Sequence, residues 1–161
     1  MDANILNQFI KATGEVFEQV CQLQLRKAGL KLHETGEKFK VEVATILGIA
    51  GELRGQMVVV LTEPVACKFA SSLLMGTPVD SYNEMAESGV CEMANMIAGK
   101  AAQFLHTIGY TIDISVPSIV RGKDVEISFF PRTPVFVLNF DSDWGNIQLV
   151  VRIEVSKDDK K

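Results

Sequence analysis

The sequence contains few of the side chains that most often bind metals or act as nucleophiles. Two histidines, His33 and His106, lie far apart in the 161-residue chain, without cysteines or carboxylates around them at the spacing of a zinc site. The three cysteines, Cys21, Cys67 and Cys91, are odd in number, widely spaced and placed in apolar runs. Such cysteines are typical of small buried side chains in a reducing cytosol, and they argue against a disulfide framework.

Sequence motifs for nucleotide binding and for serine catalysis are missing as well. The chain has no GxxxxGK[ST] motif and no GxGxxG motif after an expected strand, so no phosphate-binding glycine loop is indicated. Ser71, Ser72 and Ser115 have no histidine in a recognisable pattern, which argues against a Ser-His-Asp hydrolase. Zinc, nucleotide and serine-hydrolase chemistry are therefore all without support in the sequence.

The charge balance and the lack of long apolar runs exclude two further classes. With 16 basic and 20 acidic residues the net charge is −4, whereas nonspecific nucleic-acid binding needs a positive surface. No apolar run approaches the roughly 18–20 residues of a membrane span, and the opening MDANILNQF lacks the basic segment and apolar core of a signal peptide. We expect a cytoplasmic protein with no nucleic-acid or membrane partner. Its length fits one domain over residues 1–161, with a charged tail at 157–161.

Hydrophobic periodicity predicts three helices and about six strands. The polar and irregular stretch 26–38 is expected to be a loop. Helix followed by strands occurs twice, in 2–61 and in 81–155, which suggests two similar halves around one sheet. We therefore predict the α+β class, a single layered domain of about six mostly antiparallel strands with three helices. The expected helices are 2–25, 62–75 and 81–109, and the expected strands are 39–50, 56–61, 110–116, 124–130, 134–140 and 147–155.

The ends of the expected helices carry recognisable signals. Asp2 and Thr62 can cap the first two helices, and Ser81 with Glu84 reads as a capping box for the third. Gly109 stands where a left-handed residue would end the third helix. The apolar residues expected to be buried are Val65, Phe69, Leu73 and Leu74 on the second helix, and Ala86, Val90, Ala94, Ile97, Ala101, Phe104, Leu105 and Ile108 on the third.

The opposite face of the long third helix is the candidate functional surface. Ser88, Glu92, Asn95, Gly99 and His106 all point away from the apolar stripe at about 100° per residue. Glu92 and Asn95 are neighbours across one turn, and Gly99 continues their row. A mid-helix glycine costs about 1 kcal/mol relative to alanine, but it leaves bare backbone that another surface could approach closely. The same pattern also fits a solvated polar face with an incidental glycine, so both interpretations stay open.

An extended string around this face resembles a known family. Ser88-x3-Glu92-x2-Asn95, followed by MIAGK and by Pro117 after the next expected strand, is similar to the motif of the CheC/CheX/FliY phosphatases of bacterial chemotaxis, most of all CheX. The short E-x-x-N string is common by chance, but GVCEMANMIAGKAAQFL and TIDISVPSIVRGKD are much more specific. MDANILNQFI, TILGIAGELRGQMVVVL and SSLLMG also resemble CheX, so the likeness covers nearly the whole chain.

The resemblance implies a CheC-like fold and hydrolysis of the aspartyl phosphate on a CheY-type response-regulator receiver domain. Asn95 would insert into the partner and orient the attacking water, and Glu92 would pair with the lysine beside the acyl phosphate. Ser88 and Gly99 would belong to the surface that binds the partner. The chain itself would bind no cofactor or metal, because the magnesium ion belongs to the receiver domain.

The resemblance also bears on the number of sites and of subunits. CheC-type members carry the motif on two equivalent helices, but here the first helix offers Glu15 with Glu18 where an asparagine should stand, so a single site is implied. A homodimer, formed through an exposed strand edge, is implied as well. Two other readings remain: a non-catalytic module that binds a receiver domain or a flagellar-switch component through the same face, and a structural fragment whose helix face is only solvated.

Overall fold

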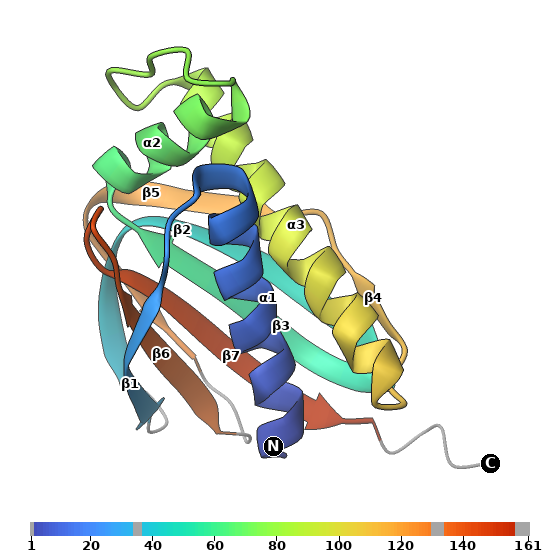
Figure 1. Cartoon of the computed structure of the whole chain (residues 1–161). Helices are drawn as coiled ribbons and strands as arrows, with labels where there is room; N and C mark the ends of the chain where they lie inside the picture. The colour runs from blue at the N-terminus through green and yellow to red at the C-terminus, as the bar shows by residue number, and fades with distance from the viewer. Residues whose placement is uncertain (1, 34–36, 130–133, 157–161) are drawn as a thin grey trace.

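The structure, a computed structural model, describes residues 2–33, 37–129 and 134–156 and contains one antiparallel sheet with three helices (Figure 1). This architecture confirms the predicted α+β class. The predicted charged tail at 157–161 lies outside the described residues. The elements are α1 (Ala3–Cys21), β1 (Arg26–His33), β2 (Lys38–Gly51), β3 (Leu53–Leu61), α2 (Glu63–Leu73), α3 (Glu84–Thr107), β4 (Ile112–Ile114), β5 (Ser118–Ser128), β6 (Val135–Asp141) and β7 (Ile147–Val155).

The order of strands in the sheet is symmetric about its centre. The strands follow one another as β1-β6-β7-β3-β2-β4, and β5 pairs with β2 on the same side as β4. β3 and β7 form the centre, and each is flanked by its hairpin neighbour, β2 or β6. The first long strand of each half pairs with the other half, so that β1 lies beside β6 and β5 lies beside β2. The two halves suggested by the sequence are thus present, and their exchanged strands join them into one sheet.

Strand β1 corrects the loop predicted over residues 26–38. It pairs with β6 from Arg26, opposite Asp141, to His33, opposite Val135. Leu30 and Leu32, which share one face, are 47% and 54% exposed, and no residue from Arg26 to His33 is fully buried on either face. The strand has no β-branched or aromatic residue, and apolar and polar residues alternate only from Leu30 to His33, so the signal that would predict it is weak. In the part of the chain that the structure describes, the sheet has seven strands, which are the six predicted strands and β1.

The three helices cover one face of the sheet, and the main core lies between the two layers (Figure 1). Phe17 of α1 and Phe69 of α2 meet edge to face with their ring centroids 5.3 Å apart. α1 and α3 lie side by side over the sheet, where Met93 and Ile97 of α3 are fully buried. None of the described helices combines the length and the hydrophobicity needed to cross a membrane. A smaller apolar cluster on the opposite face of the sheet contains Val41, Ala44, Val58, Val60, Val135, Val137 and Val150.

Helix α2 packs against the first half of α3 with very little space between the two backbones. A Cβ atom added to Gly89 of α3 would lie 2.7 Å from the Cβ and 2.9 Å from the Cα of Ala70 in α2. Glycine allows the close approach because it has no side chain to separate the helices. This contact fixes α2 beside the outward face of α3.

The structure moves the start of the long helix from Ser81 to Asn83. The Asn83 side chain accepts hydrogen bonds from the backbone N–H groups of Met85 and Ala86 at 3.0 and 3.1 Å. The predicted capping box is therefore wrong, because Glu84 is the first helical residue and not the third. At the other end Gly109 takes a φ of +94° and ends the helix as predicted.

Other errors of the prediction lie at strand bounds and at helix ends. β3 begins at Leu53 and not at residue 56, β4 spans only Ile112–Ile114, and β5 begins at Ser118 and not at residue 124. Leu74 and Ile108, predicted to be buried, are 41% and 40% exposed. Each of these residues follows the last helical position, so the predicted apolar stripe is one residue too long in both helices. α1 begins after its predicted cap Asp2 but ends at Cys21, because Gln22 adopts a left-handed conformation with a φ of +52°.

The caps of α3 allow a direct test. Asn83→Ala is expected to lower the free energy of unfolding by about 1 kcal/mol, because two backbone N–H groups lose their acceptor. Ser81→Ala is the matched control and is expected to leave stability unchanged, since Ser81 precedes the helix. Urea unfolding followed by circular dichroism measures both variants. A loss in Ser81→Ala that equals the loss in Asn83→Ala would contradict this assignment.

Candidate functional site

The predicted functional row does face solvent on α3. Ser88, Glu92 and Asn95 are exposed, Gly99 is half-buried, and His106 is exposed in the last turn of the helix. The other face of α3 is buried in the core, as the apolar stripe predicted. Since Glu92 and Asn95 are three residues apart on a regular helix, the structure brings the carboxylate and the amide together on one outward surface.

The polar side chains of this row are free to contact another molecule. Within the described residues, Ser88, Glu92 and Asn95 form no side-chain hydrogen bond or ion pair. A Cβ atom added to Gly99 would meet nothing within 4 Å, so the backbone there is open to a close approach from outside. The row therefore offers an acceptor, an amide that both donates and accepts, and a gap in the side-chain layer.

The equivalent position on α1 is already engaged within the chain. Glu15 Oε2 lies 3.0 Å from the Nζ of Lys100, and Lys100 also donates a hydrogen bond of 3.0 Å to Gln19. The Lys100 ammonium is thereby held against α1 and not beside Glu92. Glu18 stands where an asparagine would be needed for a second motif. The arrangement fits the predicted single site on α3.

A groove between α2 and α3 borders the row and was not anticipated from the sequence. Its volume is about 510 Å³, and it opens at the C-terminal end of α2. The sequence LLMG could have indicated the groove, because it has more apolar side chains than the end of a short helix can bury. Its apolar lining includes Leu73, Leu74 and Met85, and its polar lining is Glu84, Ser88 and Glu92.

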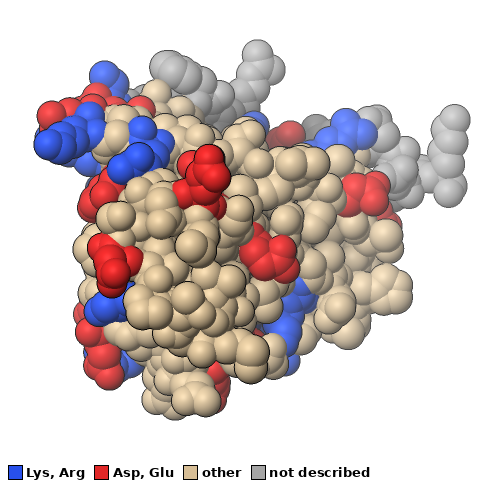
Figure 2. All heavy atoms as spheres, turned by 90° about the horizontal axis from the view of Figure 1, so that it is seen from above, with Lys and Arg blue, Asp and Glu red and all other residues tan. Residues whose placement is uncertain are grey.

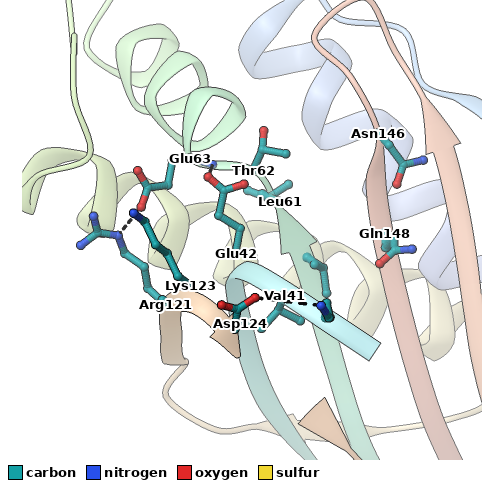
Figure 3. A pocket seen from close by; sticks show the side chains of 13 residues that line it. Val41, Glu42, Leu61, Thr62, Glu63, Arg121, Lys123, Asp124, Asn146 and Gln148 are labelled. Carbon is teal, nitrogen blue, oxygen red and sulfur yellow. Dashed lines mark hydrogen bonds and ion pairs between the residues drawn. The ribbon is translucent and has the colours of Figure 1, made fainter. Parts of the chain in front are cut away.

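A larger cavity, with a volume of about 830 Å³, lies elsewhere (Figure 3). It is lined by residues of β2, β3, β5 and the β6–β7 hairpin together with the start of α2, and by none of α3. Arg121 Nε donates to Glu63 at 2.7 Å, and the Glu42 carboxylate accepts from the backbone N–H of Glu63 at 3.2 Å. Arg121 and Glu63 pair with each other, and Glu42 accepts from the backbone at the start of α2, so both contacts hold α2 to the sheet.

The three cysteines are poorly suited to nucleophilic chemistry. Burial raises the pKa of the Cys21 thiol to about 11. Burial also raises the pKa of Cys67 and of Cys91, and the nearby carboxylates of Glu63 and Glu87 add to the effect. A reactive cysteine needs the opposite shift, because the thiolate is the nucleophile. Among the described residues, no three His, Cys, Asp or Glu side chains come together in a way that could hold a metal ion.

Comparison with known proteins identifies the family. A family model described as "Chemotaxis phosphatase CheX" matches residues 43–141, which run from within β2 to the end of β6 and include the whole row on α3. The CheY-P phosphatase CheX of Thermotoga maritima is 30% identical over 130 residues, covering 81% of this chain and 83% of the relative. The chain belongs to the CheX family.

Solved structures of CheX proteins share the fold. The crystal structure of the chemotaxis protein CheX from Vibrio vulnificus is 25% identical, with a TM-score of 0.85 over 94% of this chain and 100% of that chain. The CheX–CheY complex with BeF3 and magnesium from Borrelia burgdorferi is 24% identical, with a TM-score of 0.68 over 92% of this chain and 97% of that chain. A CheC-like superfamily protein from Shewanella sp. PV-4 shares the fold as well, with 22% identity and a TM-score of 0.85 over 96% of this chain and 99% of that chain, which confirms the expected CheC-like fold.

Substitution of two glycines in α3 distinguishes the effect of helix packing on stability from the effect of helix propensity. Gly89→Ala is expected to destabilise the protein by about 1–3 kcal/mol, because its Cβ would overlap Ala70 and push α2 away from α3. Gly99→Ala, which meets open space, is expected to stabilise it by up to about 1 kcal/mol through helix propensity alone. Denaturant unfolding measures the stability of both variants. If Gly89→Ala were as stable as Gly99→Ala, the close contact between Gly89 and Ala70 would be contradicted.

Proposed function

We propose that this CheX-family protein hydrolyses the aspartyl phosphate of a CheY-type response-regulator receiver domain through the outward face of α3. The observation that carries the proposal is the pair of exposed, unpartnered side chains of Glu92 and Asn95 on one rigid helix. The relative from Thermotoga maritima is named a CheY-P phosphatase, and the structure from Borrelia burgdorferi is a complex of CheX with CheY. Both support a phosphorylated receiver domain as the substrate.

Asn95 has the chemistry needed to position water. A carboxamide presents a carbonyl acceptor and two N–H donors, so it can accept from a water molecule while it donates to a phosphoryl oxygen. In the proposed complex, the amide enters the receiver's active site and aligns the water with the phosphorus atom. The N–H groups would also stabilise the charge that spreads over the phosphoryl oxygens.

Glu92 would fix the register of docking. Its carboxylate lies one turn from Asn95 and is free to accept a charge-assisted hydrogen bond from the lysine beside the acyl phosphate of the partner. Ser88 and Gly99 complete the contact surface at the two ends of the row. At Gly99, the lack of a side chain lets the partner approach the helix backbone.

The proposed reaction needs little from this chain beyond positioning. An acyl phosphate is already activated, and phosphoryl transfer depends mainly on alignment of the reactants and on charge stabilisation. We propose that the receiver domain supplies the magnesium ion and the lysine, and that this chain supplies the amide and the carboxylate. A homodimer remains a prediction that comes from the family resemblance, and a cytoplasmic location remains one that comes from the composition of the sequence.

Asn95→Ala is expected to lower the rate of dephosphorylation by about 10²–10³, the loss seen when a positioned polar catalytic group is removed. Because Asn95 is exposed, the unfolding free energy should change little. Asn7→Ala, which truncates another exposed helical asparagine on α1, is the matched control and should keep full activity. The measurement follows the decay of a phosphorylated receiver domain with each variant in excess. Equal rates for Asn95→Ala and the wild type would remove the proposed mechanism.

Glu92→Gln is expected to weaken binding of the receiver domain and to make binding less sensitive to salt, because an ion pair is lost across the interface. Glu87→Gln alters another exposed carboxylate on α3 that points away from the row, and should leave the affinity unchanged. Titration at two ionic strengths compares the variants. If the receiver binds through Glu92 while its phosphate lifetime is the same with and without the protein, the non-catalytic binding module is the correct reading.

A further inference from the structure

The C-terminus of α2 holds an exposed methionine in a backbone conformation that suits glycine. Met75 has a φ of +57°, in the left-handed region, and its side chain is 97% exposed. Its N–H bonds to the Ser72 carbonyl at 3.2 Å, and the N–H of Gly76 bonds to the Ser71 carbonyl at 2.8 Å. This is the paired-bond ending of a helix in which glycine, or sometimes asparagine, occupies the position that Met75 takes here.

Folding of this chain gives no reason for a methionine at that position. The left-handed conformation is unfavourable for a residue with a long side chain, and almost none of the Met75 side chain is removed from water. Asparagine or glycine would satisfy the same backbone geometry without strain. Burial against another molecule would explain why a large apolar side chain stands in a strained and fully solvated position.

Met75 directly follows Leu74, and Leu74 lines the groove that reaches the proposed docking face. Leu74 and Met85, 41% and 47% exposed, line the groove between α2 and α3. Glu84 and Glu92 line the same groove, and no lysine or arginine does. Seen from the end of the molecule that carries the α2–α3 connection, a broad stretch of surface carries only a few scattered charged side chains, several of them acidic (Figure 2).

We propose that the apolar shoulder, defined as Leu74, Met75 and Met85, is a specificity-determining part of the receiver-binding surface. It would bury an apolar side chain that stands next to a basic residue on the receiver, beside the rim of the receiver's phosphorylation site. The acidic lining of the groove favours such a basic neighbour, and Glu92 joins the groove directly to the catalytic row. This inference rests on the proposed function and adds to it the part of the surface that selects the partner.

The test uses Met75→Asn, which suits the left-handed backbone and removes the apolar side chain. The probe is the CheY-type receiver domain of the host that binds the wild-type protein most tightly, loaded with beryllium fluoride and magnesium. We expect binding to weaken about tenfold and the KM for dephosphorylation to rise equally, with kcat unchanged. The urea midpoint should stay the same or rise. Met85→Gln should also weaken binding, whereas the control Leu32→Thr, on the distant edge strand β1, should not.

The outcomes separate the shoulder from the catalytic proposal. Weaker binding of Met75→Asn with no hydrolysis by the wild type would support the shoulder and overturn the phosphatase. Normal affinity in both Met75→Asn and Met85→Gln, or a fall in kcat alone, would overturn the shoulder and leave the phosphatase standing. If sedimentation showed that Met75→Asn turns a wild-type dimer into a monomer without changing receiver affinity, the shoulder would be a contact between copies and the proposal would fail.

Discussion

The burial of one face of α3 is the constraint on which the rest of the structure depends. That face packs on the sheet and on α1, and the contact between Gly89 and Ala70 fixes α2 against the first half of the helix. Because one side of α3 is held in this way, the opposite side cannot rotate inward, and Glu92 and Asn95 keep a fixed direction toward solvent. The positions of Glu92 and Asn95 are thus fixed by the packing of the helix in the core, and not by hydrogen bonds or ion pairs of their own side chains.

Among the described residues, no cluster of side chains could hold a metal ion, and burial makes the cysteine thiols weak nucleophiles. A surface that acts on a group bound to another protein needs rigid placement and hydrogen bonds, and the other protein can supply the charge. The pairing of Glu15 with Lys100 shows how the other half of the molecule differs: the matching carboxylate on α1 is used inside the chain. The two halves share strand order and helix position, but only α3 presents an open motif.

Sequence periodicity predicted the helices, the class of fold and the outward row, because these depend on where apolar residues recur. It failed where burial does not govern the local structure. Strand β1 is exposed on both faces and reads as a loop, and Leu74 follows the end of α2 so closely that the pattern counts it as core. The true cap Asn83 lies two residues from a plausible capping box, and only the hydrogen bonds to Met85 and Ala86 decide between them. The groove beside Glu92 depends on two helices, so neither helix alone predicts it.

The most direct test of the central claim is to map the contact on the labelled protein by nuclear magnetic resonance. A receiver domain loaded with beryllium fluoride and magnesium is titrated into the ¹⁵N-labelled chain, and the backbone and side-chain amide signals are followed. The largest changes are expected along α3 from Ser88 to Gly99, including the side-chain amide of Asn95. Changes that gather instead around Glu63 and Arg121 at the large cavity, with the α3 signals unmoved, would contradict the account.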